Sequence, residues 1–321
     1  MSPELNFFIT VALIAAATLA GYLARRLRWA PEKAAEPLMT FVLVGGYSSV
    51  GFLSIWALRR LDASAAWLPA LGAVQVLVML AACIAIGRLL FADRTEAGLF
   101  GVASGMGNNS FTMGAFIVYR IYGAEGLGLA NIFCLMWTPL VVLALYPVAR
   151  AFSTRRPEGT LGRLIFRSIF NWRSVGLPLA AVALVLSARG VPYPRVLHDA
   201  HVVDILMFTI TPVAFFSIGL RLHLGSVWRY RKSILWLAVT RFGLAAGVGL
   251  ALAVATRLTP WPLAGLGWNV FLIQAFVPTA VTMVVLANMF HLHPGQASVL
   301  FVVNSAMYLA IVLPVVMWLF R

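Results

Sequence analysis

Two adjacent asparagines stand among glycines and hydroxyl residues inside an apolar segment, in the stretch Gly105-Met106-Gly107-Asn108-Asn109-Ser110-Phe111-Thr112-Met113-Gly114. Glycine frees the backbone, and asparagine side chains can replace hydrogen bonds that an interrupted helix loses. Within a bilayer, unwound backbone is tolerated only where it is buried in protein or lines a water-filled cavity. Amide and hydroxyl groups at such a break could bind a polar solute, as in the substrate site of a secondary transporter.

A second candidate break lies in a later apolar segment, at Val277-Pro278-Thr279-Ala280. Proline lacks a backbone donor and clashes with the preceding helical turn, so it kinks or breaks a helix. Two matched breaks predict helices that cross near the membrane midplane, where half-helix N-termini favour an anionic ligand. The predicted helix-break residues are Gly107, Gly114 and Pro278.

Polar residues at the two breaks are the candidates for substrate binding. They are Asn108, Asn109, Ser110, Thr112, Gln274, Pro278, Thr279 and Thr282. We expect Asn109 and the residues flanking Pro278 to bind a carboxylate, so that Asn109→Ala abolishes transport by a protein that stays folded. The alternative is structural: the asparagines cap half-helices, the hydroxyls bond to their own helix, and Gln274 faces a neighbouring helix.

Arg241 is a basic residue within an apolar segment. Ionisable residues inside a membrane are costly and often functional, which makes Arg241 a candidate for gating or for the anion route. The alternative is that its side chain reaches the interface or packs between helices.

The elements that must position these groups follow from composition. The chain has 321 residues, of which 62% are hydrophobic and 11% charged. Because soluble domains average about 25% charged residues, we predict an all-α integral membrane protein. We predict ten transmembrane helices, of which the one at 174–189 is short, at 5–24, 37–58, 67–90, 97–119, 126–149, 174–189, 202–222, 233–256, 263–290 and 296–320.

The basic residues predict the orientation of these segments. Of the 24 Lys and Arg residues, 16 fall on the side that holds the loops after the odd-numbered segments. The largest cluster is in the central connection, with Arg150, Arg155, Arg156, Arg163, Arg167 and Arg173. The positive-inside rule places that connection in the cytoplasm and both termini outside. The net charge of +14 is therefore explained by topology and contact with the lipid bilayer, without a nucleic-acid partner.

The central connection divides the chain into two halves of five segments. We predict a first repeat at 1–150, a basic cytoplasmic connection at 151–173 and a second repeat at 174–321. Five is odd, so the halves would form an inverted repeat with crossing helices 4 and 9 broken. Thr112-Met113 and Thr282-Met283 are matching pairs in these two helices. Gly101-x-x-x-Gly105 and Gly243-x-x-x-Gly247 predict close helix packing.

These motifs resemble the auxin efflux carrier family, which includes the plant PIN-FORMED auxin exporters and bacterial carriers of organic acids. Asn109-Ser110-Phe111-Thr112-Met113-Gly114 is similar to the family's Asn-Thr-x-x-Met-Gly element, and Gln274-Ala275-Phe276-Val277-Pro278 to its Gln-Ala-x-x-Pro element. His293-Pro294 and Phe216-Ser217-Ile218-Gly219-Leu220 also fit. The family usually has a proline shortly after Met-Gly, where this chain has Phe116, so glycine and asparagine alone would hold the first break open.

The resemblance implies ten helices, with helices 1, 2, 6 and 7 as a scaffold and helices 3–5 and 8–10 as a transport part that moves like an elevator. It also implies a homodimer in the bacterial inner membrane. The expected function is secondary active or potential-driven transport of a small organic anion, such as a carboxylate or an auxin-like acid. The bile acid/sodium symporters share this architecture, so a sodium-coupled symporter is the alternative.

Other classes of protein fit the sequence less well. An enzyme needs a nucleophile and base or a metal constellation at one depth, and none is visible. A channel would show polar rings along a pore. A sensor that retains the fold is compatible with the residues. We expect no cofactor and no metal site, although backbone carbonyls and Asn or Ser oxygens leave Na⁺ binding open.

Overall fold

The computed structural model describes residues 3–58, 63–110, 112–154, 160–171, 174–222 and 227–320. Phe111 of the first break, and Arg155, Arg156 and Arg173 of the central connection, lie outside these residues. Within the described residues the fold is helical, and an isolated antiparallel bridge joins Gly107 to Thr279.

Seven helical runs among the described residues are long and apolar enough to cross a membrane. They are Phe8–Arg26, Glu32–Trp56, Ala63–Leu90, Gly114–Phe152, Val202–Leu220, Val227–Leu258 and Pro294–Leu319. Two shorter apolar helices, Gly176–Ala188 and Gly265–Phe276, accompany them. The chain thus has the architecture of a multi-pass membrane protein.

The first half of the chain builds the following helices in order. They are α1 (Pro3–Arg26), α2 (Ala35–Phe41), α3 (Ser48–Trp56), α4 (Trp67–Leu90), α5 (Arg94–Gly105), α6 (Gly114–Phe133), α7 (Trp137–Leu140) and α8 (Tyr146–Phe152). Within α6, Gly123 leaves the helical conformation with φ 65° and ψ −153°, so the chain turns there. Wide π-helical turns lie at Val42–Tyr47 and Val141–Leu145.

The second half continues from the central connection. Its helices are α9 (Leu161–Ile169), α10 (Gly176–Ala188), α11 (Arg195–Asp199), α12 (Val202–Leu220), α13 (Arg231–Ala238), α14 (Ala245–Ala255), α15 (Gly265–Phe276), α16 (Thr282–Met289), α17 (Pro294–Met307) and α18 (Leu313–Leu319). Wide turns recur at Val239–Leu244 and Tyr308–Val312.

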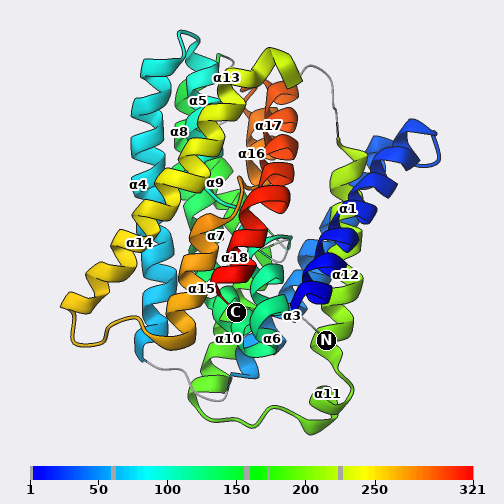
Figure 1. Ribbon diagram of the computed structural model, residues 1–321, viewed down its shortest axis with the longest axis vertical. Coiled ribbons are helices and arrows are strands. Elements are labelled where there is room, and N and C mark those ends of the chain that lie inside the picture. Colours follow the sequence, from blue (N-terminus) through cyan, green and yellow to red (C-terminus); the bar gives the residue numbers. More distant parts are fainter. Residues whose placement is uncertain are drawn as a thin grey trace.

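The helices pack in two groups. In one group, α1 packs along α12, which also contacts α2, and α3 packs against α10. In the other group, α4 packs along α5 and contacts α14, and α13 packs against α17. Figure 1 shows α1 and α12 together at one side of the molecule, with α4, α5 and α13 toward the other side.

Apolar side chains cover the outside of these helices as well as the core. On α10, Ala180 and Ala183 are buried, whereas Leu177, Val182 and Val185 are exposed. A helix that is apolar on all faces and exposed on most of them requires an apolar surrounding. Lipid chains supply that surrounding in a membrane.

Candidate functional site

The two predicted breaks meet and pair with each other. The chain is extended between α5 and α6 and again between α15 and α16. Asn108 N donates to the Pro278 carbonyl at 2.6 Å, and Ala280 N donates to the Met106 carbonyl at 3.0 Å. Each break therefore satisfies part of the backbone groups that the other broken helix releases, as a membrane interior requires.

Glycine at the first break permits this close approach. A Cβ atom at Gly107 would lie 2.3 Å from Arg241 Nη2, and one at Gly114 would lie 2.1 Å from Gln274 Oε1. Such distances are far below van der Waals contact, so side chains at either position would push the crossing apart. The break after α5 forms without a proline, since Phe116 lies within α6.

Asn109 and Gln274 join the breaks through their side chains. Asn109 Nδ2 donates to Gln274 Oε1 at 2.9 Å and to the Gln274 carbonyl at 2.7 Å, while Gln274 Nε2 donates to the Asn109 carbonyl at 3.1 Å. Both residues are buried. In this structure the Asn109 amide thus ties α15 to the first break.

Asn108 and the nearby hydroxyls form a second cluster. Thr112 Oγ1 donates to Asn108 Oδ1 at 2.5 Å and lies 3.1 Å from Ser110 Oγ. The Asn108 carbonyl accepts from Gly114 N at 2.9 Å, at the start of α6. The asparagine therefore orders the N-terminal turn of α6 through both its side chain and its backbone.

Thr279 at the second break is held by two distant elements. Its backbone N–H donates to Asn304 Oδ1 at 2.8 Å, and its hydroxyl donates to the Ala103 carbonyl at 2.6 Å. Asn304 lies on α17 and was missed in the sequence, where a single asparagine in an apolar helix carries no mark of its partner. Proline breaks the helix here, and Asn304 binds one of the N–H groups beside the break.

Arg241 lies behind the crossing, in the wide turn between α13 and α14. Its Nη2 and Nε donate to the Val277 carbonyl at 2.7 and 3.3 Å, and its Nη1 donates to the Ser104 carbonyl at 3.2 Å. These carbonyls end α15 and α5, where the helix dipoles are negative. The buried guanidinium therefore stabilises two helix C-termini at once.

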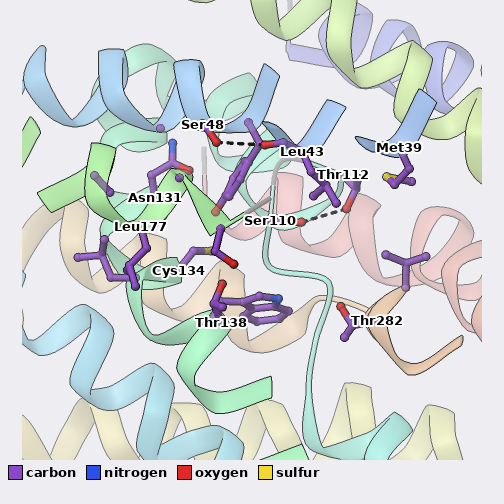
Figure 2. Close-up of a pocket in the computed structure, with 18 of the residues that line it drawn as sticks. Met39, Leu43, Ser48, Ser110, Thr112, Asn131, Cys134, Thr138, Leu177 and Thr282 are labelled. Atoms are coloured by element: carbon purple, nitrogen blue, oxygen red, sulfur yellow. Dashed lines mark hydrogen bonds between the residues drawn. The ribbon is translucent and has the colours of Figure 1, made fainter. Parts of the chain in front are cut away.

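A cavity of about 290 Å³ lies beside the crossing. Its lining residues include Tyr47, Ser48, Gly51, Ser110, Thr112, Asn131, Cys134, Trp137, Thr138, Ser174, Leu177, Arg221, Val281 and Thr282. Figure 2 shows Ser110 and Thr112 beside the extended segment, with Thr138 and Thr282 across the cavity from Ser48.

The cavity divides the predicted site residues into two sets. Ser110, Thr112 and Thr282 line it. The remaining candidates are not among its lining residues, namely Asn108, Asn109, Gln274, Pro278, Thr279 and Arg241. These six residues build the crossing, while the cavity adds groups that sequence reasoning missed. Among these, Asn131 and Arg221 are polar residues in or next to apolar segments, which is the signal that could have found them.

The cavity combines apolar side chains with polar groups and a positive charge. Among the described residues around it, Arg221 is the charged one, and hydroxyls come from Ser48, Ser110, Thr138 and other residues. Thr112 precedes α6 and Thr282 begins α16, so the positive ends of two half-helices adjoin the space. Such a site suits a small anion. No group of acidic, cysteine or histidine side chains arranged for a metal ion occurs in the described part of the chain.

On α6, near the other end of the molecule, polar contacts join the two helix groups. Tyr119 donates from its hydroxyl to Asp204 Oδ1 at 2.5 Å. Arg120 Nε donates to Thr10 Oγ1 at 2.9 Å, and its guanidinium lies 5.2 Å from the centre of the Phe208 ring. Thr10 belongs to α1, and Asp204 and Phe208 belong to α12. These contacts connect one half-helix of the crossing to the α1–α12 pair.

Comparison with known proteins adds no assignment. No protein-family model matches this chain, and no curated protein matches it.

Proposed function

We propose that the protein is a secondary active or potential-driven transporter of a small organic anion, a carboxylate or an auxin-like acid. The observation that carries this proposal is the cavity beside two paired helix breaks, with Arg221 and the starts of α6 and α16 around it. Unwound, paired half-helices next to a polar cavity are the arrangement that carriers use for substrate binding.

The proposal includes ten transmembrane helices in an inverted repeat. The order of elements supports it: α5, a break and α6 in the first half correspond to α15, a break and α16 in the second. The wide turns at Val141–Leu145 and Tyr308–Val312 occupy matching places in the fifth and tenth segments. The pairing of α1 with α12 and of α3 with α10, beside the separate pairing of α4 with α5 and of α13 with α17, supports the division into scaffold and transport parts, which meet where α3 packs against α6.

Alternating access would move the crossing and its cavity against the scaffold. Ser48 and Leu177 line the cavity from the scaffold group, and Thr282 lines it from the transport group. Substrate bound there would contact both parts. By the positive-inside rule, Arg221 and Ser174 lie at cytoplasmic helix ends, while Tyr119 and Asp204 lie toward the outside. The arrangement is therefore that of an inward-facing state with the outer contacts closed.

A sodium-coupled symporter of the bile-acid type is the alternative function. Na⁺ at a helix break is coordinated by oxygen atoms, with backbone carbonyls at helix C-termini among them. Here the carbonyls of Ser104 and Val277 accept hydrogen bonds from Arg241. A fixed guanidinium at these carbonyls disfavours a cation there, so we propose transport that does not require Na⁺.

Uptake into proteoliposomes tests the proposal. Purified protein with an imposed membrane potential should accumulate radiolabelled carboxylates whether the buffer contains Na⁺ or K⁺. Protein-free liposomes give the background. A strict requirement for Na⁺ would replace the proposal by the symporter alternative, and absence of any carboxylate uptake would refute the organic-anion assignment.

Asn109→Ala, assayed for both uptake and folding, tests the expected role of the crossing. The hydrogen bonds to Gln274 predict that this variant loses transport with a lowered melting temperature. A folded variant with wild-type uptake would remove Asn109 from the mechanism. Asn288→Ala is the matched control, because that exposed asparagine donates to the Val284 carbonyl of its own helix.

A further inference from the structure

Asn131 lines the cavity with one amide atom paired and the other unpaired. It lies on α6 after the Gly123 turn and is 4% exposed. Its Nδ2 donates to Ser54 Oγ at 2.9 Å, and Ser54 Oγ donates to the Gly51 carbonyl at 3.3 Å. Because the serine hydroxyl proton is used on that carbonyl, Ser54 accepts from Asn131. The atom left without a protein partner is Asn131 Oδ1.

A glycine of α3 lies close to this oxygen. Gly51 also lines the cavity, and a Cβ atom built there would lie 4.0 Å from Asn131 Oδ1. Any larger side chain at position 51 would occupy that space, and glycine leaves it open. Figure 2 shows Asn131 at the side of the cavity near Ser48, away from Thr282.

A buried acceptor without a donor is unfavourable, and most native buried polar atoms are paired. A fixed amide oxygen at a cavity wall selects ligands that carry a hydroxyl or N–H group, since a ligand that lacks the group leaves the oxygen unpaired. Apolar side chains of Leu43, Ile55 and Leu177 surround the same space and can contact the body of such a ligand.

We propose that Asn131 is a specificity-determining residue of the cavity, where its Oδ1 accepts a hydrogen bond from a hydroxyl or N–H group of the transported carboxylate. This inference rests on the proposed transport of an organic anion. It deepens that function by naming the substrate class: carboxylates that carry a hydrogen-bond donor, in preference to analogues without one.

Matched ligand pairs test this inference on the purified full-length protein. The probes are lactate and propionate, malate and succinate, and 4-hydroxyphenylacetate and phenylacetate, with affinities measured by calorimetry and melting temperature. In at least one pair, the donor-bearing acid should bind wild type roughly ten-fold more tightly or better. Asn131→Leu should reduce that preference to near one by weakening only the donor-bearing member.

Controls separate this inference from the function on which it rests. Asn288→Leu, at an exposed asparagine outside the cavity, should keep the wild-type preference. If Asn131→Leu does not fold, Asn131→Ala serves instead, because it removes the oxygen and adds no bulk. Equal binding within every pair by wild type, or a preference that survives loss of Asn131, overturns the inference alone. If no acid of the three pairs binds, the organic-anion function fails and the inference fails with it.

Discussion

At the scale of single residues, the Arg241 side chain supplies hydrogen bonds that two interrupted helices lose at their ends. Its position in a wide turn brings the guanidinium to the Ser104 and Val277 carbonyls, which belong to two different helices. Burial of the charge is costly, but each hydrogen bond from a charged donor contributes about 1.5–3 kcal/mol, and unpaired buried carbonyls would cost a similar amount. We therefore assign Arg241 to holding the crossing together.

Replacing Arg241 by methionine tests this balance. Arg241→Met keeps most of the side-chain volume but leaves the carbonyls without donors, so we expect a loss of about 3 kcal/mol in stability. Arg241→Lys should lose less, although one ammonium group cannot reproduce the fork of the guanidinium. Thermal unfolding in detergent measures both, with exposed Arg229→Ala as the control. A melting temperature that rises in Arg241→Met would mean that desolvation outweighs the hydrogen bonds.

The hydrogen bonds of Asp93, which lies outside the membrane spans, predict that the protein loses folding stability at low pH. Asp93 caps α5 by accepting from Thr95 N at 2.9 Å, and it lies 2.6 Å from His293 Nε2. Partial burial acts to raise the pKa of Asp93, but hydrogen bonds from Thr95 and His293 outweigh that effect and lower it. A carboxylate whose pKa is lowered by folding stabilises the folded protein at pH values above its pKa in the unfolded chain, which is about 3.9. This stabilisation is lost as the pH falls through the pKa of the same group in the folded protein.

The melting temperature as a function of pH tests this effect. Wild type should lose stability on acidification below about pH 4, and Asp93→Asn should lose less over the same range because it has no proton to take up. The neutral variant should already be less stable than wild type at pH 7. Parallel curves for the two proteins would show that Asp93 does not contribute to the acid sensitivity.

At the scale of elements, the half-helix that begins at Gly114 is joined to the crossing at its start, and to α1 and α12 near Tyr119 and Arg120. Arg241 and Gln274 hold the crossing through hydrogen bonds with Val277 and Asn109. Tyr119 and Arg120, at the far end of the same half-helix, contact α12 and α1. Outward opening would have to break these latter contacts, whereas those at the crossing can move with it.

Tyr119→Phe should therefore favour the outward-facing state. It removes the hydrogen bond to Asp204 and keeps the ring, so we expect a several-fold rise in access to the cavity from outside. A Thr138→Cys reporter in the cavity measures that access when it is labelled by an impermeant maleimide in right-side-out vesicles. Cys83 and Cys134 are replaced by alanine in this protein, because the free Cys134 thiol also lines the cavity. Tyr122→Phe is the matched control, because its hydroxyl donates to the Phe320 carbonyl. Unchanged labelling would show that Tyr119 does not hold the outer side closed.

At the scale of the whole molecule, the distribution of charge predicts the orientation in the membrane. The even number of proposed spans puts both termini on one side, opposite the basic central connection. In the proposed orientation, Arg221 would lie at the cytoplasmic end of α12, where it lines the cavity. The proposed inward-facing assignment therefore depends on the predicted orientation in the membrane, and a test of one is a test of the other.

Reporter fusions in a bacterial host test the orientation. Alkaline phosphatase fused at the C-terminus should be active, since it folds only outside the cytoplasm, and a fusion after Thr160 in the central connection should be inactive. Green fluorescent protein at the same sites should give the reverse pattern. A fluorescent C-terminal fusion would invert the topology and make Tyr119 and Asp204 a cytoplasmic contact.

Much of the architecture could be predicted from the sequence because it depends on local composition. Apolar length predicts helices that span a membrane, and glycine with asparagine, or proline, predicts where two of them break. The glycine pairs spaced four residues apart predicted close helix packing correctly in one case and wrongly in the other. Gly101 and Gly105 do lie against Ile84 and Leu80 of α4, but the packing prediction for Gly243 and Gly247 is wrong, because both adjoin open space.

Sequence by itself determined that this is a helical membrane protein with two interrupted helices, since those features arise within single segments. Only the tertiary structure decided that Asn109 pairs with Gln274, that Arg241 binds helix ends, and that Asn131 and Arg221 share a cavity. The reason is physical: apolar helices of similar composition carry no local mark of which faces will meet. A polar side chain acquires its role from the distant groups that packing brings within hydrogen-bond distance.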